Sequence, residues 1–289
     1  MSITLASILC GISGMVGWGI YDFLGGVFAK QIGSFKALFW SQLAGLISLI
    51  VLAMIFKPIF HLPVLTLVLF PIASMVYSAG YLFFFKGFEI GNVSIVAATM
   101  NLWAVFTMIF AFTFMGQRLS VTQTIGVLLI LVGVVLASVN WSEIREQKFH
   151  LSAGVKEAIA GAFFFGIFWN ISEIISENIG WLHTTLLVKF GIIVFLLAFS
   201  AVAKRELGLG STASKTKSAI LLMGIIEAGA VAIVNYGLTI GDAILITPIA
   251  SALSIVTILL AIIFLKDKIT KFQGFGIMAA IAGIVITGM

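Results

Sequence analysis

Apolar residues fill this chain in ten long runs that are separated by short polar segments. The runs cover about residues 4–29, 34–56, 63–85, 92–115, 120–139, 155–179, 182–203, 217–239, 243–265 and 270–288. A helix needs roughly 20 apolar residues to cross the hydrocarbon core of a bilayer, and each run is close to that length. Only two polar connections are long, residues 140–154 and 204–216. The pattern predicts an all-α membrane protein with ten transmembrane helices.

The second half of the chain repeats the first at an offset of 150 residues. Matching positions include the pairs Gly87 and Gly237, Ile90 and Ile240, Gly126 and Gly276, and Gly133 and Gly283. Five spans are an odd number, so two successive copies must lie in opposite orientations in a membrane. We therefore expect two inverted five-helix repeats, residues 1–139 and 155–289, joined by a linker of residues 140–154. Inverted repeats around a site at the midplane are typical of secondary transporters.

Composition supports a membrane location, because 61% of the 289 residues are hydrophobic and only 9% are charged. The net charge of +5 does not indicate nucleic-acid binding, since the basic residues lie singly or in short clusters between apolar runs. Cys10 is the only cysteine, which excludes an internal disulfide and a cysteine-based metal site. No metal and no cofactor are expected. The first apolar run has no cleavage site and should be a retained helix.

Basic residues predict the orientation in the membrane. The loops after odd-numbered helices hold thirteen Lys or Arg residues, whereas the loops after even-numbered helices hold only Lys57 and Arg118. Cytoplasmic loops carry the excess of positive charge. We therefore expect a multi-pass protein of the cell membrane with both termini outside the cytoplasm. The one remaining basic residue, Lys189, lies within a predicted helix.

Several short motifs occur in a fixed order along both halves. They are Trp18-Gly19 within WGIYDFLGG, Ser41-Gln42, the turns Gly91-Asn92 and Gly241-Asp242, the polar stretches GQRLS from Gly116 and LKDKIT from Leu265, and Pro248. In these motifs the chain resembles the ten-helix EamA-type members of the drug/metabolite transporter superfamily. Relatives usually carry Glu after the fourth helix of each repeat, where this chain has Gln117 and Asp267.

The resemblance covers essentially the whole chain. It implies two five-helix repeats and a secondary carrier of small organic solutes, often an exporter of amino acids or other metabolites. It does not fix the substrate, because the superfamily spans amino acids, amines, sugars and nucleotide sugars.

Four ionisable residues lie well inside the predicted spans, away from their ends, namely Asp22, Glu173, Lys189 and Glu227. A charge there costs several kcal/mol unless it faces a cavity or a partner. At 1.5 Å per residue, Glu173 and Lys189 lie about 10 Å below the same surface, which predicts an ion pair that is either a gate or merely structural. Asp22 has no basic neighbour at its depth, and Glu227 lies near the middle of its helix. These two carboxyls are the candidates for proton coupling.

Each of those carboxyls also has an alternative role. Asp22 could form a hydrogen bond with Gln42 that only joins two helices. Glu227 could be a protonated carboxyl bonded to a neighbouring helix.

The first two helices of each half align at an offset of 147 residues, which matches Gln42 with Lys189. One polar residue in each second helix therefore lies at a mirrored depth. We interpret the two as substrate contacts that face a cavity, one from each half. The alternative is that Lys189 extends along its stem to the lipid headgroups.

Four aromatic residues with polar edges, Trp18, Tyr81, Trp103 and Trp169, fall near the middle of predicted helices. Together with the carboxylates they could hold a cation against their ring faces. Ordinary packing is the alternative for each of them. Asn170 is a further polar group at this depth, suited either to hydrogen bonds with a substrate or to contacts between helices.

These patterns favour a secondary transporter, and we expect an exporter of small amine-bearing metabolites such as amino acids. It would work by alternating access, with proton coupling left open. The alternative within transport is a carrier of quaternary-ammonium or other organic cations, favoured if the central aromatics converge. A lipid-headgroup flippase component or a membrane enzyme would be a different class, but no His lies beside two carboxylates, so no enzyme is expected. The expected partners are a small-molecule substrate and the lipid bilayer, with no nucleic acid, and the chain would act as a monomer or a homodimer.

Overall fold

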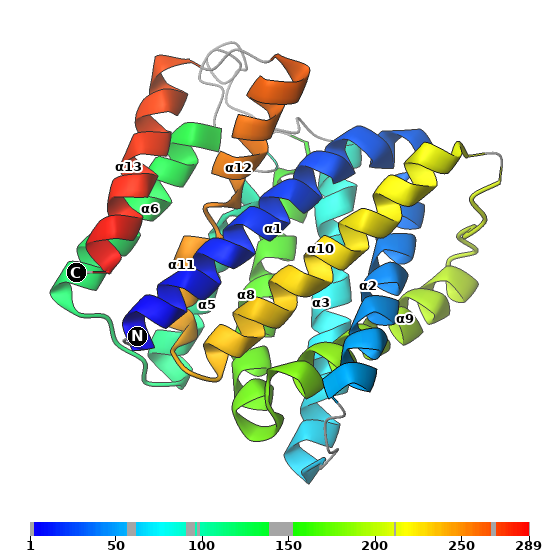
Figure 1. Ribbon diagram of the computed structural model, residues 1–289, viewed down its shortest axis with the longest axis horizontal. Helices are drawn as coiled ribbons and strands as arrows, with labels where there is room; N and C mark the ends of the chain where they lie inside the picture. Colours follow the sequence, from blue (N-terminus) through cyan, green and yellow to red (C-terminus); the bar gives the residue numbers. More distant parts are fainter. Residues whose placement is uncertain are drawn as a thin grey trace.

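The computed structural model describes residues 3–56, 62–90, 96, 99–138, 153–210, 212–266 and 270–288. All regular elements in these ranges are helices, which confirms the all-α prediction. They form a bundle of long, roughly aligned helices (Figure 1). The helices are α1 (Ile3–Ile32), α2 (Ser34–Phe56), α3 (Val64–Ile90), α5 (Leu102–Phe114), α6 (Val121–Ser138), α8 (Val155–Ile179), α9 (Trp181–Val202), α10 (Ser214–Leu238), α11 (Ala243–Ala250), α12 (Leu253–Leu260) and α13 (Lys271–Thr287), with a π-helical turn at Ala261–Leu265.

Seven helical segments in the described part of the chain are long and apolar enough to cross a membrane. They are α1, α2, α3, α8, α9, α10, and the stretch that α11 and α12 share. Three more apolar helices, α5, α6 and α13, are shorter. The predicted linker, residues 140–154, lies outside the described residues except for its last two positions.

The helices α6 and α13 begin with the same local signal, a capping box. In α6, the Gln123 backbone N–H donates to Ser120 Oγ (3.2 Å), and the Ser120 N–H donates to Gln123 Oε1 (2.9 Å). In α13, Thr270 and Gln273 make the same two bonds at 3.3 and 2.8 Å. These reciprocal bonds satisfy two backbone donors that the first turn of a helix leaves free. Both helices therefore start at repeat-equivalent positions.

The same two helices pack against each other in opposite directions, and Figure 1 shows them side by side at one edge of the bundle. Early in α6, a Cβ on Gly126 would lie 2.8 Å from the Gly283 carbonyl oxygen, near the end of α13. Later in α6, a Cβ on Gly133 would lie 2.6 Å from the carbonyl oxygen of Gly276. The reverse contacts, from Gly276 to Gly133 and from Gly283 to Gly126, are each 2.6 Å. The backbones can approach this closely only because these four positions lack a side chain.

The stretch 243–265 is not one continuous helix. A turn at Ser251-Ala252 separates α11 from α12. At this turn the Ser251 hydroxyl donates to the Pro248 carbonyl oxygen (2.7 Å), and the Ala252 N–H donates to the Ile249 carbonyl oxygen, only three residues back (3.1 Å). Asn101 forms a turn at the repeat-equivalent position, just before α5. Broken helices are tolerated in a membrane where they are buried in protein.

At the centre of the bundle, α2 packs against α10 and α3 packs against α9, and the two contacts use repeat-equivalent positions. Gly224 on α10 lies directly against the backbone carbonyl of Ser41 on α2. Ser74 on α3, which is 150 residues before Gly224, donates a hydrogen bond of 3.1 Å to the Val188 carbonyl on α9. Val188 is the position 147 residues after Ser41. The two contacts join equivalent elements of the two halves and bring the polar residues of all four helices together.

Candidate functional site

A buried ion pair lies where these four helices meet. Lys189 on α9 and Glu227 on α10 form a salt bridge, with side-chain exposures of 1% and 0%. The Lys189 Nζ also donates to Gln42 Oε1 on α2 at 2.5 Å. Glu227 Oε1 accepts a hydrogen bond of 2.5 Å from the Tyr77 hydroxyl on α3. We call Gln42, Tyr77, Lys189 and Glu227 the central cluster, in which each charge has an opposite charge and a further polar partner.

The central cluster is built from two pairs of repeat-equivalent positions. Gln42 and Lys189 are separated by the offset of 147 residues and are hydrogen-bonded to each other. Tyr77 and Glu227 are separated by the offset of 150 residues and are also hydrogen-bonded to each other. When two copies of a unit are related by a two-fold axis, a contact between equivalent positions lies at that axis. The cluster is therefore placed where the two halves of the chain meet.

The predicted ion pair between Lys189 and Glu173 is wrong, because Lys189 pairs with Glu227. The long Lys189 stem reaches from α9 towards Gln42 on α2 and Glu227 on α10 rather than towards α8. With 1% of its surface exposed, Lys189 does not extend to the lipid headgroups either.

Glu173 instead belongs to a second polar group at the start of α11. Its two carboxylate oxygens accept hydrogen bonds from Gln117 Nε2 at 2.8 and 2.9 Å, and Oε1 also accepts one from the Ala243 N–H at 3.0 Å. Gln117 Oε1 accepts from the Ile244 N–H at 3.1 Å. We call Glu173, Gln117 and these two N–H groups the Glu173 cluster. A carboxylate suits this place because the first N–H groups of a helix are unpaired and carry partial positive charge.

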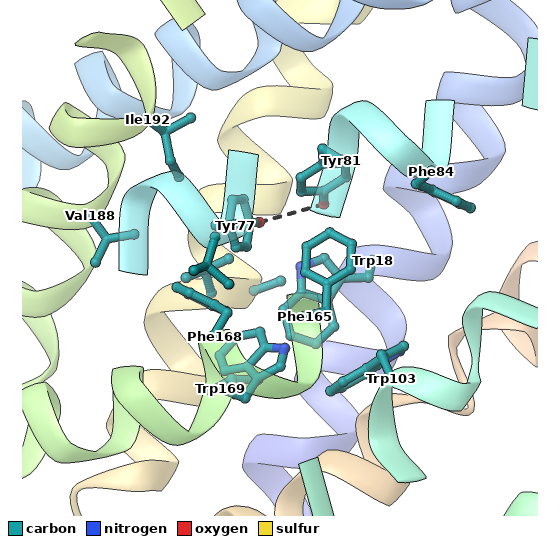
Figure 2. Packing of buried hydrophobic residues seen from close by; sticks show 14 of the residues in the cluster. Trp18, Tyr77, Tyr81, Phe84, Trp103, Phe165, Phe168, Trp169, Val188 and Ile192 are labelled. Carbon is teal, nitrogen blue, oxygen red and sulfur yellow. Dashed lines mark hydrogen bonds between the residues drawn. The ribbon is translucent and has the colours of Figure 1, made fainter. Parts of the chain in front are cut away.

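Three of the four predicted aromatic residues converge. The ring centroids of Trp18 on α1 and Trp169 on α8 are 5.2 Å apart, and Trp103 on α5 lies 6.1 Å from each of them. Figure 2 shows these three indoles gathered beside Phe165 and Phe168. The Trp18 N–H is buried without a hydrogen-bond partner in the described structure.

Tyr81 lies next to this group but closer to the central cluster. Its hydroxyl is 3.5 Å from that of Tyr77, as the dashed line in Figure 2 marks. Phe168 connects the two regions, since its ring centroid is 4.6 Å from Tyr77 and 4.8 Å from Trp169. The aromatic residues and the central cluster are thus one continuous buried region.

Asp22 on α1 is partly buried and has no hydrogen bond or ion pair within the described part of the chain. The alternative bond to Gln42 is not formed, because the Gln42 amide nitrogen has no partner there. Asp22 is close enough to Tyr21 and Tyr81 to interact with them electrostatically. Glu227, the other carboxyl group near these aromatic residues, is paired with Lys189, whereas Asp22 has no basic partner in the described part of the chain.

Asn170 joins α8 to α5. Its Nδ2 donates to the carbonyl oxygens of Thr107 (3.1 Å) and Gly166 (2.9 Å), while its Oδ1 has no partner in the described structure. No group of three or more His, Cys, Asp or Glu residues that could hold a metal occurs among the described residues.

The sequence analysis did not predict two residues of these clusters, Tyr77 and Gln117, as site residues. A signal for Tyr77 exists, since it occupies the position equivalent to Glu227. A signal for Gln117 exists as well, because it stands where relatives usually carry Glu after the fourth helix.

Long apolar helices, a buried ion pair and a broken helix define a multi-pass membrane protein with a polar centre. Comparison with protein families matches the EamA-like transporter family over residues 5–139 and again over residues 152–289. The chain belongs to this family, and it is a membrane transporter of the drug/metabolite transporter superfamily. Members of the family are transporters rather than enzymes.

A comparison with curated proteins gave no match. A solved structure described only as "Crystal structure of protein" is similar over 97% of this chain and 94% of its own, with a TM-score of 0.77. Its sequence identity of 15% means that this likeness concerns the fold.

Proposed function

We propose that the chain is a secondary carrier with ten spans in two inverted five-helix repeats, residues 1–139 and 155–289, joined by a linker of residues 140–154. One observation carries this proposal: in the central cluster, equivalent residues of the two halves contact each other. The antiparallel packing of α6 against α13 supports it, because equivalent helices of inverted repeats run in opposite directions. Carriers of this build alternate access by moving one half against the other around a site at the midplane.

The position of the central cluster suits a point about which the two halves of the chain rotate against each other. Points near a rotation axis move least, so contacts there can persist while the ends of the helices separate. Its charges are neutralised, which a buried pair requires if it is to remain in the membrane throughout the cycle. We propose that Gln42, Lys189 and Glu227 are the substrate contacts that the central cluster provides.

The substrates that fit best are small amine-bearing metabolites such as amino acids, moved outwards. The support is the position of Asp22, an unpaired carboxyl one helical turn from Trp18 and close to Tyr81. A carboxylate and the faces of aromatic rings both attract an ammonium group. Trp103, Trp169 and Asn170 complete the proposed substrate contacts.

Asp22 is also the first candidate for proton coupling. A carboxyl group in a low-dielectric environment can exchange protons near neutral pH, and Asp22 has no cation to hold it ionised. Glu227 is the second candidate, because Lys189 and Tyr77 already occupy its two oxygens.

A carrier of quaternary-ammonium or other organic cations is the second candidate function. The convergence of Trp18, Trp103 and Trp169 favours it, since a set of aromatic faces binds a cation that has no N–H to donate.

An uptake screen in proteoliposomes would test these proposals. Amino acids, amines, sugars and tetramethylammonium would be supplied with and without a pH gradient. We expect an amine-bearing solute to accumulate under the gradient, and Asp22→Asn to abolish accumulation while some exchange remains. Glu177→Gln, which removes an exposed carboxyl of α8, is the control and should transport normally.

Two results would revise the proposal. Normal accumulation by both Asp22→Asn and Glu227→Gln would exclude an obligatory proton site at either residue. Preference for tetramethylammonium over every primary amine would favour the second candidate function.

We also propose that both termini lie outside the cytoplasm in the cell membrane, on the strength of the thirteen basic residues after odd-numbered helices. A reporter that is active only in the cytoplasm should work when fused within residues 204–216 and fail at the C-terminus. The opposite pattern would reverse the orientation and leave the fold unchanged.

A further inference from the structure

The Glu173 cluster ties three separate parts of the chain together at one end of the bundle. Glu173 comes from α8, Gln117 from the connection after α5, and the two N–H groups from the first turn of α11. This is the end at which α10 leads into α11 (Figure 1). Glu173 and Ser176 are buried, with exposures of 0% and 1%, so solvent does not reach these two side chains.

The helix that these bonds hold is a separate short unit. The eight residues of α11 are all buried, and the turn at Ser251-Ala252 divides them from α12. A helix that is broken at one end can change its tilt without moving the rest of its span. Its position is then set by what holds its other end, which here is the Glu173 cluster.

The two halves of the chain differ at this point. With the offset of 147 residues, the position equivalent to Glu173 in the first half is Gly26, which has no side chain. A carboxylate from the first helix can therefore hold the fourth helix in the second half only. The central cluster joins equivalent positions, whereas the sequence gives the Glu173 carboxylate no counterpart in the first half.

We propose that Glu173 and Gln117 are positioning residues that latch α11 in place and keep this end of the transporter closed. The inference rests on the proposed alternating access, and it concerns which side is open rather than what is carried. Because hydrogen bonds to a charged acceptor are strong, losing the carboxylate should shift the balance between closed and open states about tenfold towards open at this end.

Cysteine labelling in lipid nanodiscs tests the latch without a known substrate. In a Cys10→Ser background, Ser176→Cys would report on the latched end, since the Ser176 hydroxyl has no hydrogen-bond partner to lose. Met223→Cys, on α10 beside Gly25 of α1, would report on the opposite end. The measured quantity is the rate at which a polar maleimide modifies each cysteine.

We expect Glu173→Gln to raise the labelling rate of Ser176→Cys about tenfold and to leave that of Met223→Cys unchanged or lower. The double variant Glu173→Gln/Gln117→Glu should restore slow labelling. In it the amide at position 173 donates to the carboxylate at position 117, and each oxygen still accepts one backbone N–H of α11. The matched control Glu177→Gln removes an exposed carboxyl one turn away and should change neither rate.

Three results would overturn the latch. These are an unchanged rate at Ser176→Cys in folded Glu173→Gln protein, equal increases at both reporters, and failure of the double variant to restore slow labelling. Equal increases would mean general loosening, and a monodisperse elution profile would show that each variant is folded. Labelling that follows our expectation in a protein that transports none of the tested solutes would support the latch and count against the proposed function.

Discussion

Glu227 and Glu173 are two fully buried glutamates that this protein accommodates in different ways. Glu227 is neutralised by a lysine side chain and lies between equivalent positions of the two halves. Glu173 is held by an amide side chain and by a backbone N–H at the start of a helix, and its equivalent in the other half is a glycine. Glu227 thus contacts its own repeat equivalent, Tyr77, whereas the contacts of the equally buried Glu173 do not join equivalent positions.

The two glutamates should therefore differ in how much stability is lost when one of their partners is substituted. A buried ion pair depends strongly on both partners, because removing one leaves an uncompensated charge in a low-dielectric environment. A carboxylate held by neutral donors loses less when one donor is removed, since the remaining donors still satisfy it. Breaking the ion pair of the central cluster should therefore cost more stability than a substitution at the Glu173 cluster.

The largest effect is expected from breaking the ion pair. Lys189→Met should destabilise the protein by about 3–5 kcal/mol, because Glu227 then keeps only the Tyr77 hydroxyl. The double variant Lys189→Met/Glu227→Gln should be less destabilised than Lys189→Met alone. Unfolding midpoints in detergent would measure both. Strictly additive losses in the double variant would argue against the pair.

A smaller loss of stability is expected when Glu173 is replaced. Glu173→Gln should cost roughly 1.5–3 kcal/mol, the usual range for hydrogen bonds to a charged group. Combined with Lys189→Met, the two losses should add, because the two clusters share no contact. A coupling energy above about 0.5 kcal/mol in this cycle would mean that the clusters are not independent.

Tyr77→Phe should cost about 1–2 kcal/mol, since Glu227 loses one donor but keeps Lys189. Tyr81→Phe, which removes a hydroxyl 3.5 Å from that of Tyr77, is the comparison and should cost less. If the two variants unfold at the same midpoint, the bond from Tyr77 to Glu227 contributes no more than an ordinary buried hydroxyl.

The smallest effect on stability is expected for Asp22→Asn. Asp22 has no hydrogen bond or ion pair in the described part of the chain, so the change should stay within about 0.5 kcal/mol. A large loss in the same unfolding assay would show that Asp22 has a structural partner, which would weaken its proposed role in coupling.

The sequence predicted the helices well, because a helix in a bilayer must be mostly apolar along its length and the polar segments mark its ends. The apolar runs agree with the long helices to within a few residues for α2, α8 and α9. The breaks at Asn101 and at Ser251-Ala252 were not predicted. Hydropathy does not mark these breaks, because the residues on both sides of each turn are apolar.

The repeat also carried information about the central cluster. The offset of 147 residues matched Gln42 with Lys189, and the structure joins them by a hydrogen bond. The partner of Lys189 could not be predicted from depth, because counting residues along a helix gives height in the membrane but not the direction in which a side chain points. Applying the offset of 150 residues to Glu227 would have selected Tyr77.

The glycine contacts between α6 and α13 bear on the origin of the chain. Gly126 contacts Gly283 and Gly133 contacts Gly276. The two halves therefore use equivalent glycine positions on both sides of this contact. Two identical half-length chains lying antiparallel would form the same contact as a closed, two-fold symmetric dimer. An ancestral gene for one half could thus have encoded a complete assembly. Duplication and fusion would then have freed the two copies to diverge, until a tyrosine in one faced a glutamate in the other.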